Sequence, residues 1–285
     1  MDQNTAGKIK LTLLRIVVYA ILVFLCMLCL FFFYLMVINA SRSNAELAKG
    51  FTLLPSGNFF TNLKNAWTDS SINIPRGMLN SLIIALSTAV LTTYFSALTA
   101  YGVHVYDFKG KKLVFTFIMA IMMIPAQVSA LGFVQLMNKL NLNDNFLPLI
   151  VPGIAAPVVF FYMKQYMESV LPLDVIDAAR VDGSSEFRTF NTIVLPMLKP
   201  ALAVQMIFSF VSSWNNYFVP ALLLNKAELK TVPIMIAQLR SADYSKFDMG
   251  KVYMFILLAI LPVVITYVIL SKSIIKGVTA GSVKG

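Results

Sequence analysis

Six long uncharged runs constrain this chain more than any other feature of its sequence. Each run has 18 to 25 residues and contains no Asp, Glu, Lys or Arg. A helix needs about 20 apolar residues to cross a bilayer. We therefore predict an all-α integral membrane protein with six transmembrane helices, at Ile16–Ile38, Leu79–Val103, Leu113–Met137, Phe146–Met163, Ala201–Leu224 and Val252–Leu270.

The fourth run contains four residues that break or kink helices. Pro148, Pro152, Gly153 and Pro157 all fall within its 18 residues. Backbone groups freed by such residues must be satisfied by protein rather than lipid. We therefore predict a kinked or interrupted helix here, shielded by other helices.

Composition supports the membrane class and excludes several others. The chain is 58% hydrophobic and 13% charged, whereas soluble proteins average about 25% charged residues. The net charge is +10, but Lys and Arg cluster beside the apolar runs, which indicates contact with the lipid bilayer and not with nucleic acid. Cys26 and Cys29 are the only cysteines and His104 is the only histidine, so we predict no metal or redox site.

The distribution of Lys and Arg predicts the orientation. Segments 1–15, 104–112 and 271–285 hold nine of these residues in 39 positions, whereas 39–78, 138–145 and 225–251 hold ten in 75. Because the denser set is expected inside, the tails 1–15 and 271–285 are predicted to be cytoplasmic, together with 164–200. The first run has 23 residues, more than the roughly 7–15 of a cleaved signal, so we predict that it is retained.

Two segments predicted outside are long. In 39–78, the stretch Asn58–Asp69 places Phe59, Phe60, Leu63 and Trp67 at roughly helical spacing, which predicts an amphipathic helix at the membrane interface. Segment 225–251 mixes both signs of charge, including Asp243, and is either a docking surface or a solvated loop.

Catalytic and energy-coupling chemistry is absent from the sequence. There is no nucleotide-binding loop, no nucleophile elbow and no zinc-protease motif, so we predict a non-catalytic subunit. The six runs also lack the ionisable residue that an ion-driven carrier usually keeps at membrane depth. Uphill transport would therefore draw its energy from another subunit.

The polar segment Leu171–Pro200 stands out between the fourth and fifth runs. Pro172 and Asp174 predict a helix start with Asp174 as cap, and Asp177 adds a carboxylate near that end. Gly183 is placed for a left-handed C-terminal cap. Ser184 or Ser185 would then cap a second helix, Glu186–Val194, which Pro196 ends. The alternative is an ordinary amphipathic linker.

This segment resembles the EAA loop of ABC-importer permeases. The matching residues are Asp177-Ala178-Ala179, then Gly183, then Ile193-Val194-Leu195-Pro196, with Asp in place of the first Glu. Several other short stretches of the sequence are similar to those of the carbohydrate-importer branch of this family, of the maltose-permease type. They comprise Leu171-Pro172, Arg180–Gly183, Phe190, Asn80-Ser81, Pro125-Ala126-Gln127, Trp214–Tyr217 and the ending Lys276–Gly285. The resemblance covers the chain from about residue 75.

The resemblance implies a bacterial cytoplasmic-membrane, multi-pass subunit with a permease core at 79–270. Its partners would be a second permease, two cytoplasmic ATPase subunits that bind ATP and Mg, and an extracytoplasmic solute-binding protein; this chain itself would hold no cofactor. The family's coupling role falls on residues of the 171–200 loop: Asp177, Ala178, Ala179, Arg180, Asp182, Gly183, Glu186 and Arg188.

A sugar pathway requires hydrogen-bonding and aromatic side chains within the spans. The candidates are Gln127, Gln135, Gln205, Trp214, Asn215, Asn216 and Tyr217. Such amides also serve as interhelical hydrogen-bond partners, and the two aromatics are equally suited to the membrane interface. Family analogy favours an oligosaccharide. The alternatives are a polyol or glycerol phosphate on the same scaffold, a stand-alone secondary carrier, and a structural subunit without a pathway.

Overall fold

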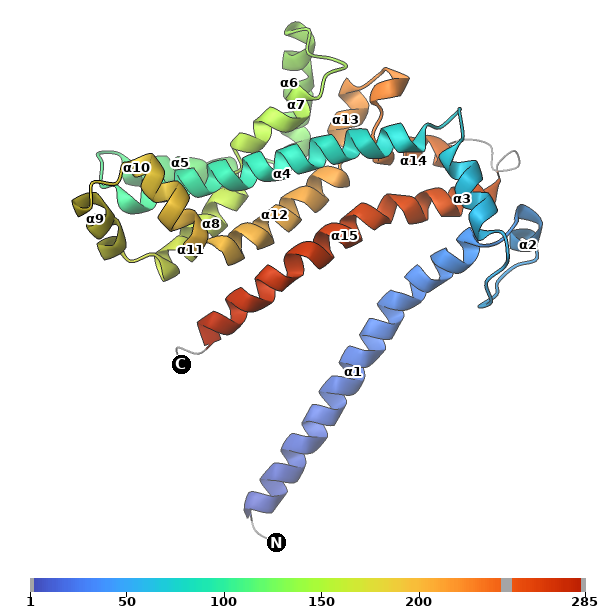
Figure 1. The fold of residues 1–285 in the computed structure, drawn as a ribbon, viewed down its shortest axis with the longest axis horizontal. Helices are drawn as coiled ribbons and strands as arrows, with labels where there is room; N and C mark the ends of the chain where they lie inside the picture. Colours follow the sequence, from blue (N-terminus) through green and yellow to red (C-terminus); the bar gives the residue numbers. More distant parts are fainter. Residues whose placement is uncertain (1–2, 242–247, 283–285) are drawn as a thin grey trace. The chain divides into compact units, whose positions relative to one another are not determined.

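The computed structural model describes residues 3–241 and 248–282, and their regular elements are all helices (Figure 1). The chain divides into two compact units, one of residues 1–70 with 242–258 and one of residues 71–241 with 259–285. The predicted all-helical fold class is therefore confirmed over the described residues. Asp243 and the rest of 242–247 lie outside them, as do 283–285 of the predicted C-terminal tail.

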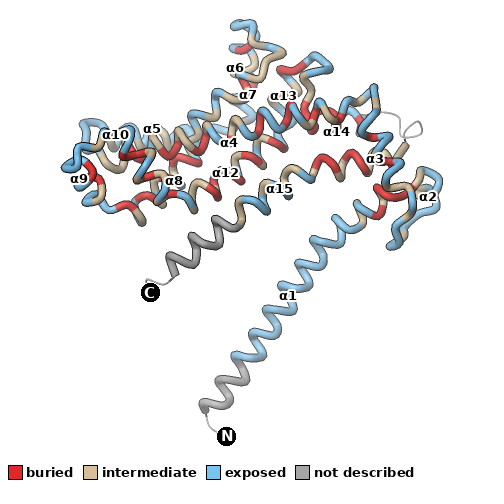
Figure 2. The backbone as a smooth tube through the Cα atoms, in the orientation of Figure 1, coloured by how far each residue is buried: buried red, intermediate tan, exposed pale blue. Residues whose placement is uncertain are grey.

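The first unit contains α1 (Gln3–Ala40), α2 (Asn44–Ala48), α3 (Phe59–Trp67) and the beginning of α15 (Met249–Ser282). Helix α3 confirms that the amphipathic stretch near Trp67 is helical. The side-chain amide of Asn62 on α3 donates to the carbonyl oxygens of Ala40 and Arg42, at 2.8 and 2.9 Å. From Leu11 to Tyr34 the residues of α1 are exposed (Figure 2).

The second unit contains the remaining helices and the part of α15 from Ala259 onward. In chain order they are α4 (Ile74–Val105), α5 (Lys111–Ile121), α6 (Ala126–Lys139), α7 (Leu147–Ile150), η1 (Val151–Ile154), α8 (Pro157–Val170), α9 (Leu173–Val181), α10 (Glu186–Thr189), η2 (Phe190–Val194), α11 (Leu195–Met197), α12 (Lys199–Trp214), α13 (Phe218–Leu223), η3 (Ala227–Leu229) and α14 (Val232–Ser241).

Four helical stretches of the described chain are long and apolar enough to cross a membrane. They are Leu11–Ala40, Ile74–Val105, Leu147–Val170 and Met249–Ser271. The bent pair Glu186–Met197 and Lys199–Trp214, which meets at 84°, is a possible fifth. The predicted count of six spans stays a prediction.

Three of the predicted spans are not continuous helices, and the breaks in two of them were not predicted. The run Leu113–Met137 is divided between α5 and α6, because Pro125 has an extended backbone with ψ of 127° and disfavours helix in the residue before it. The run Ala201–Leu224 is interrupted after Trp214 and resumes at Phe218. The predicted interruption of the fourth run is confirmed, since a short 3₁₀ helix and a break at Ala155 separate α7 from α8.

Helix α4 is the central element of the second unit. It packs against α12, α8 and η1, and it contacts α7, α14 and η3 as well (Figure 1). Small residues allow this close approach: Ala85, Ala89, Ala97 and Ala100 are completely buried. A hydrophobic cluster lies around its C-terminal half, and it includes Phe160, Met163 and Phe190.

The connecting segments gather at the two ends of α4. Near its N-terminal end, Asn80 donates to the carbonyl oxygens of Glu228 and Lys230, and Ser81 accepts from the amide of Val232. Near its C-terminal end, His104 contacts the carbonyl oxygen of Leu171 at 3.1 Å. Segments predicted on opposite sides of the membrane thus lie at opposite ends of one helix.

Gly250 provides a test of the packing in the first unit. A Cβ at this position would lie 2.4 Å from the backbone oxygen of Arg42 and 2.7 Å from Asn62 Nδ2, so the elements must separate to accept it. We expect Gly250→Ala to destabilise the protein by about 1–3 kcal/mol, the usual cost of overpacking. The measurement is the thermal unfolding midpoint in detergent.

The matched control is Gly57→Ala, because a Cβ at Gly57 meets nothing within 4 Å. Equal midpoints for the two variants would contradict the close approach of Gly250 to Arg42 and Asn62.

Candidate functional site

The predicted polar segment folds into two short helices joined at Gly183. Helix α9 begins after Pro172, whose extended backbone serves as the N-terminal cap residue. The prediction that Asp174 caps this helix is wrong by position: Asp174 lies inside the first turn, where its charge still favours the helix start. Ile176 and Ala179, three residues apart, form the buried face of α9.

Gly183 ends α9 with a left-handed backbone, at a φ of +73°. Its amide donates to the carbonyl oxygen of Arg180 at 3.0 Å, and the amide of Ser184 donates to that of Ala179 at 2.9 Å. These two bonds form a Schellman motif, which satisfies carbonyl groups left free at the helix end. The predicted left-handed cap is confirmed.

The second half of the segment is longer than predicted. Ser185 precedes α10 as its cap residue but makes no side-chain cap bond, and Ser184 instead accepts a hydrogen bond from the Thr189 hydroxyl at 2.9 Å. The helical path continues through the π-helical turn η2 and α11 to Met197, one residue beyond Pro196. A bend of 84° then leads into α12.

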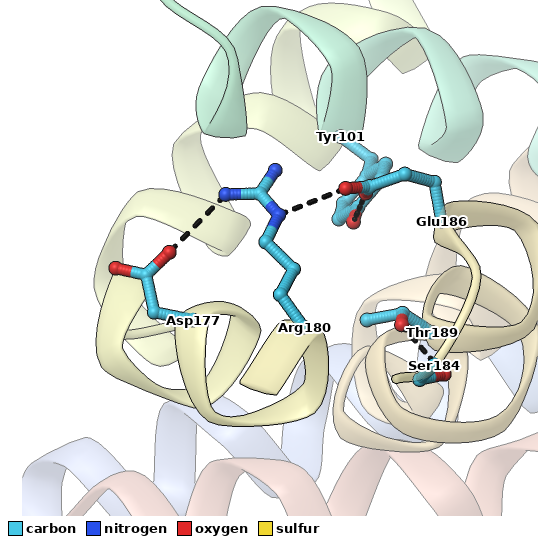
Figure 3. Close-up of polar contacts among 6 residues, drawn as sticks. All are labelled: Tyr101, Asp177, Arg180, Ser184, Glu186 and Thr189. Carbon is cyan, nitrogen blue, oxygen red and sulfur yellow. Dashed lines mark hydrogen bonds and ion pairs between the residues drawn. The ribbon is translucent and has the colours of Figure 1, made fainter. Parts of the chain in front are cut away.

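One carboxylate joins the two halves of the segment and α4 (Figure 3). Glu186 Oε1 accepts from Arg180 Nε at 2.8 Å, and Glu186 Oε2 accepts from the Tyr101 hydroxyl at 2.8 Å. Arg180 also pairs with Asp177 at 3.1 Å. The hydrogen bond that Arg180 donates to Glu186 raises the pKa of the Arg180 guanidinium above its ordinary value. The centre of the Tyr106 ring lies 5.6 Å from that guanidinium.

The eight predicted coupling residues separate into two groups. Arg180, Glu186 and Asp177 are brought together in this cluster, while Ala179 is buried against the core. Ala178, Asp182, Gly183 and Arg188 are exposed. Two apolar side chains that were not in the predicted set share this exposure, Val181 at 88% and Phe187 at 67%.

Three residues of α4 hold the segment and were missed from the sequence. Tyr101 bonds Glu186, His104 Nε2 contacts Leu171 O at 3.1 Å, and the Tyr94 hydroxyl donates to Asn191 Oδ1 at 3.2 Å. A signal was present, because positions 94, 97, 101 and 104 share one face of a helix.

A cavity of about 710 Å³ lies between α4, α8 and α12 in the second unit. On α12, Gln205, Ser209 and Ser212 are four and three residues apart, which puts their side chains on one helix face. The Ser209 hydroxyl is buried without a hydrogen-bond partner among the described residues. The full lining is Thr88, Thr92, Leu149, Ala156, Val158, Val159, Tyr162, Val204, Gln205, Phe208, Ser209, Ser212, Ser213 and Asn216.

The structure places two of the seven predicted pathway residues, Gln205 and Asn216, in the cavity lining. Gln127 and Gln135 are exposed on α6, and Asn215 and Tyr217 are exposed at the break after α12. Trp214 is buried, where its Nε1 donates to Ala259 O at 3.1 Å and its ring stacks on Phe210. The roles of all seven stay predictions. Thr88, Thr92 and Ser209 were missed, although the i, i+4 spacing of the two threonines was visible.

The cavity offers hydroxyl and amide groups beside apolar walls. Among the described residues, none that lines it is charged, and no group of His, Cys, Asp or Glu could hold a metal ion. Such a lining can hydrogen-bond a polar, uncharged molecule but offers no cation to balance a phosphate.

A separate polar contact joins two connecting loops of the second unit. The backbone amides of Lys226 and Asn225 donate to the carboxylate of Asp144, and these bonds lower the pKa of that carboxyl group.

Comparisons with known proteins identify the family to which this chain is similar. Residues 93–275 match the family model for binding-protein-dependent transport system inner membrane components. The arabinooligosaccharides transport system permease protein AraQ of Bacillus subtilis is 35% identical over 277 residues, 95% of this chain and 96% of that protein. The lactose transport system permease protein LacG of Rhizobium radiobacter is 29% identical, covering 94% of this chain and 96% of that protein.

A solved structure has the same fold. The crystal structure of a bacterial ABC transporter involved in the import of the acidic polysaccharide alginate matches with a TM-score of 0.79 at 22% identity, over 92% of this chain and 96% of that one. The resemblance to carbohydrate ABC-importer permeases that the 171–200 motif indicates is therefore confirmed. The chain belongs to the binding-protein-dependent transport system inner membrane components.

Proposed function

We propose that this chain is a permease subunit of an ATP-driven importer and that its solute is an uncharged oligosaccharide. The observation that carries this proposal is the cavity between α4, α8 and α12, whose lining combines hydroxyl, amide and aromatic groups without any charged side chain among the described residues. The 35% identity to an arabinooligosaccharide permease supports the same substrate class.

Family membership supports a proposal for the remaining subunits of the transporter. We propose that a second permease completes the pathway, that an extracytoplasmic binding protein delivers the sugar, and that two ATPase subunits bind ATP and Mg. Their contact with this chain is the coupling segment, residues 171–200. Its exposed residues Ala178, Val181 and Phe187 offer an apolar face that a partner can cover. Motion of packed helices around a central site would then alternate access to the cavity.

We further propose six spans with both termini cytoplasmic. Helices α5 and α6 together would be the third span, and α12 with α13 would be the fifth. The arrangement around α4 supports this topology, because the coupling segment lies at its C-terminal end whereas segment 225–232 lies at its N-terminal end. Irregular backbone within the membrane is tolerated where other helices shield it.

Glycerol phosphate or a polyol on the same scaffold is the competing substrate class. A phosphate group needs Arg, Lys or helix-end donors to balance its charge. Because the described cavity lining contains no Arg or Lys, the geometry favours a neutral, polyhydroxylated solute. A polyol fits that chemistry as well as a sugar does, so the substrate panel described next includes one.

The substrate class is tested with the complete transporter reconstituted with its binding protein in liposomes. We expect neutral oligosaccharides to stimulate ATP hydrolysis severalfold, and glycerol 3-phosphate and a polyol to leave it at the basal rate. The proposal would be contradicted if glycerol 3-phosphate alone stimulated hydrolysis, or if none of the saccharides did.

The cavity is tested by comparing two glutamines. Gln205 lines the cavity, whereas Gln135 is exposed on α6. We expect Gln205→Leu to raise the sugar concentration for half-maximal uptake by about tenfold, since losing a hydrogen bond in a buried site costs roughly 1–2 kcal/mol. Gln135→Leu is the matched control and should transport normally. A larger effect of Gln135→Leu than of Gln205→Leu would indicate that the sugar pathway does not run through this cavity.

The joint at Gly183 is tested by substitutions that change its backbone preference. A Cβ there meets nothing within 4 Å, so the cost of Gly183→Val comes from the φ of +73° alone. A left-handed conformation costs a side-chain-bearing residue about 1–2 kcal/mol, and more if it is β-branched. We expect uptake per ATP hydrolysed to fall about tenfold, because reshaping the joint loosens the contact with the ATPase.

Gly50 provides the matched control for this experiment. Its φ is +95° and a Cβ there also meets nothing within 4 Å, but it lies outside the coupling segment. Gly50→Val should therefore leave uptake per ATP unchanged, and Gly183→Asn should be tolerated because Asn accepts the left-handed region. Full coupling in Gly183→Val would exclude this role for the joint.

A further inference from the structure

Helix α4 touches both functional regions of the second unit. Thr88 and Thr92 in its middle line the cavity, whereas Tyr101 and His104 near its end bond the coupling segment. At 1.5 Å per residue, Thr92 and Tyr101 are about 14 Å apart along the axis. One rigid helix therefore connects the cavity wall with the segment proposed to meet the ATPase.

The bond between Tyr101 and Glu186 is the centre of this connection (Figure 3). Glu186 belongs to α10, and its second oxygen accepts from Arg180 on α9. A single carboxylate thus holds the helices on both sides of Gly183 against α4. Hydrogen bonds to an ionised group are stronger than neutral ones. The 2.8 Å from Arg180 Nε lies in the range of a charge-assisted bond, and the 2.8 Å from the Tyr101 hydroxyl is an ordinary O–H···O distance.

Two flanking bonds fix the same segment at its ends. His104 Nε2 contacts the carbonyl oxygen of Leu171, just before α9, and the Tyr94 hydroxyl donates to Asn191, just after α10. With Tyr101 between them, the three side chains follow one face of α4 over eleven residues of its sequence. The coupling segment therefore cannot rotate about its middle contact without breaking an outer one.

Apolar packing behind these bonds is dense. The Tyr101 ring is 3% exposed and lies 5.3 Å from the fully buried ring of Phe190, and Ile176 of α9 belongs to the same core cluster. This packing holds the elements together without defining the rotation of α9 about its axis, because apolar contacts are not directional. Orientation is the property that the Tyr101 hydroxyl adds.

We propose that Tyr101 is a positioning residue for energy coupling: through Glu186 and Arg180 it orients both halves of the coupling segment on α4, so that the segment and the cavity wall move as one body. The inference rests on the proposed function, since it assigns a role in the transport cycle. The hydroxyl acts through Glu186 and does not itself contact solute or nucleotide.

The experiment uses the assembled transporter in liposomes and the substitution Tyr101→Phe, which removes the hydroxyl and keeps the ring. We expect sugar transported per ATP hydrolysed to fall about tenfold, the change in an equilibrium that a hydrogen bond to a charged group can produce. ATP hydrolysis should continue at its basal rate. The control is Thr99→Val, because Thr99 is exposed on α4 and, among the described residues, its hydroxyl donates to Phe95 O of the same helix.

The outcomes separate orientation from stability. If Tyr101→Phe lowers the unfolding midpoint and reduces uptake and hydrolysis in equal proportion, its role is structural and the proposal is overturned. If its coupling ratio equals that of Thr99→Val, the proposal is also overturned. If the unmodified transporter shows no sugar-stimulated hydrolysis, the proposed function fails, and that result is distinct from either of the others.

Hydrogen exchange of the purified full chain provides a second measurement that does not need assembly. We expect the amides of 173–190 to exchange faster in Tyr101→Phe and in Glu186→Gln, which weakens the pair with Arg180, while the amides of 81–93 on α4 are unchanged. Equal exchange across 173–190 in all variants would overturn the orienting role of Tyr101.

Discussion

The carboxylate of Glu186 is the interaction on which the arrangement of the coupling segment depends. It accepts hydrogen bonds from Tyr101 of α4 and Arg180 of α9, both at 2.8 Å. Gly183 permits this convergence because its left-handed backbone turns the chain back within a few residues. A turn of different geometry would place Glu186 out of reach of one donor. The Glu186 carboxylate would then no longer link α9, α10 and α4.

The cavity differs from the Arg180 cluster because no charged side chain lines it among the described residues. A charge at membrane depth is costly, whereas hydroxyl and amide groups can line a cavity at much lower cost. Helix α12 accordingly carries Gln205, Ser209 and Ser212 along one face and apolar residues such as Ile207 and Phe210 in the core. The charges of Asp177, Arg180 and Glu186 lie outside the cavity lining, in the cluster near the end of α4.

Local signals in the sequence predicted local structure well. Gly183 indicated a left-handed cap, and the prolines of the fourth run indicated its interruption, because both effects act through a residue's own backbone. Pro125 carried the same kind of signal for the break between α5 and α6, yet the length of the apolar run outweighed it in our prediction. The family motif indicated the two-helix segment at 171–200, and its glycine coincides with the left-handed turn at Gly183.

Tertiary partners could not be predicted in the same way. The sequence does not state that Trp214 donates to Ala259, or that Tyr101 reaches Glu186 across 85 positions, because helix packing decides both. The α4 contacts were visible only as a helical spacing of aromatic residues, a pattern that membrane helices also use for simple packing.

The charges of the coupling segment constrain the kind of partner surface that can cover it. Asp177 and Glu186 share Arg180 within the chain, so part of their charge is already balanced before any partner arrives. Val181 and Phe187 are the most exposed apolar side chains of the segment, and they lie in a surface that also exposes Asp174, Asp182 and Arg188. We therefore expect shape and apolar burial to dominate the contact, with Asp182 and Arg188 setting its register at the rim.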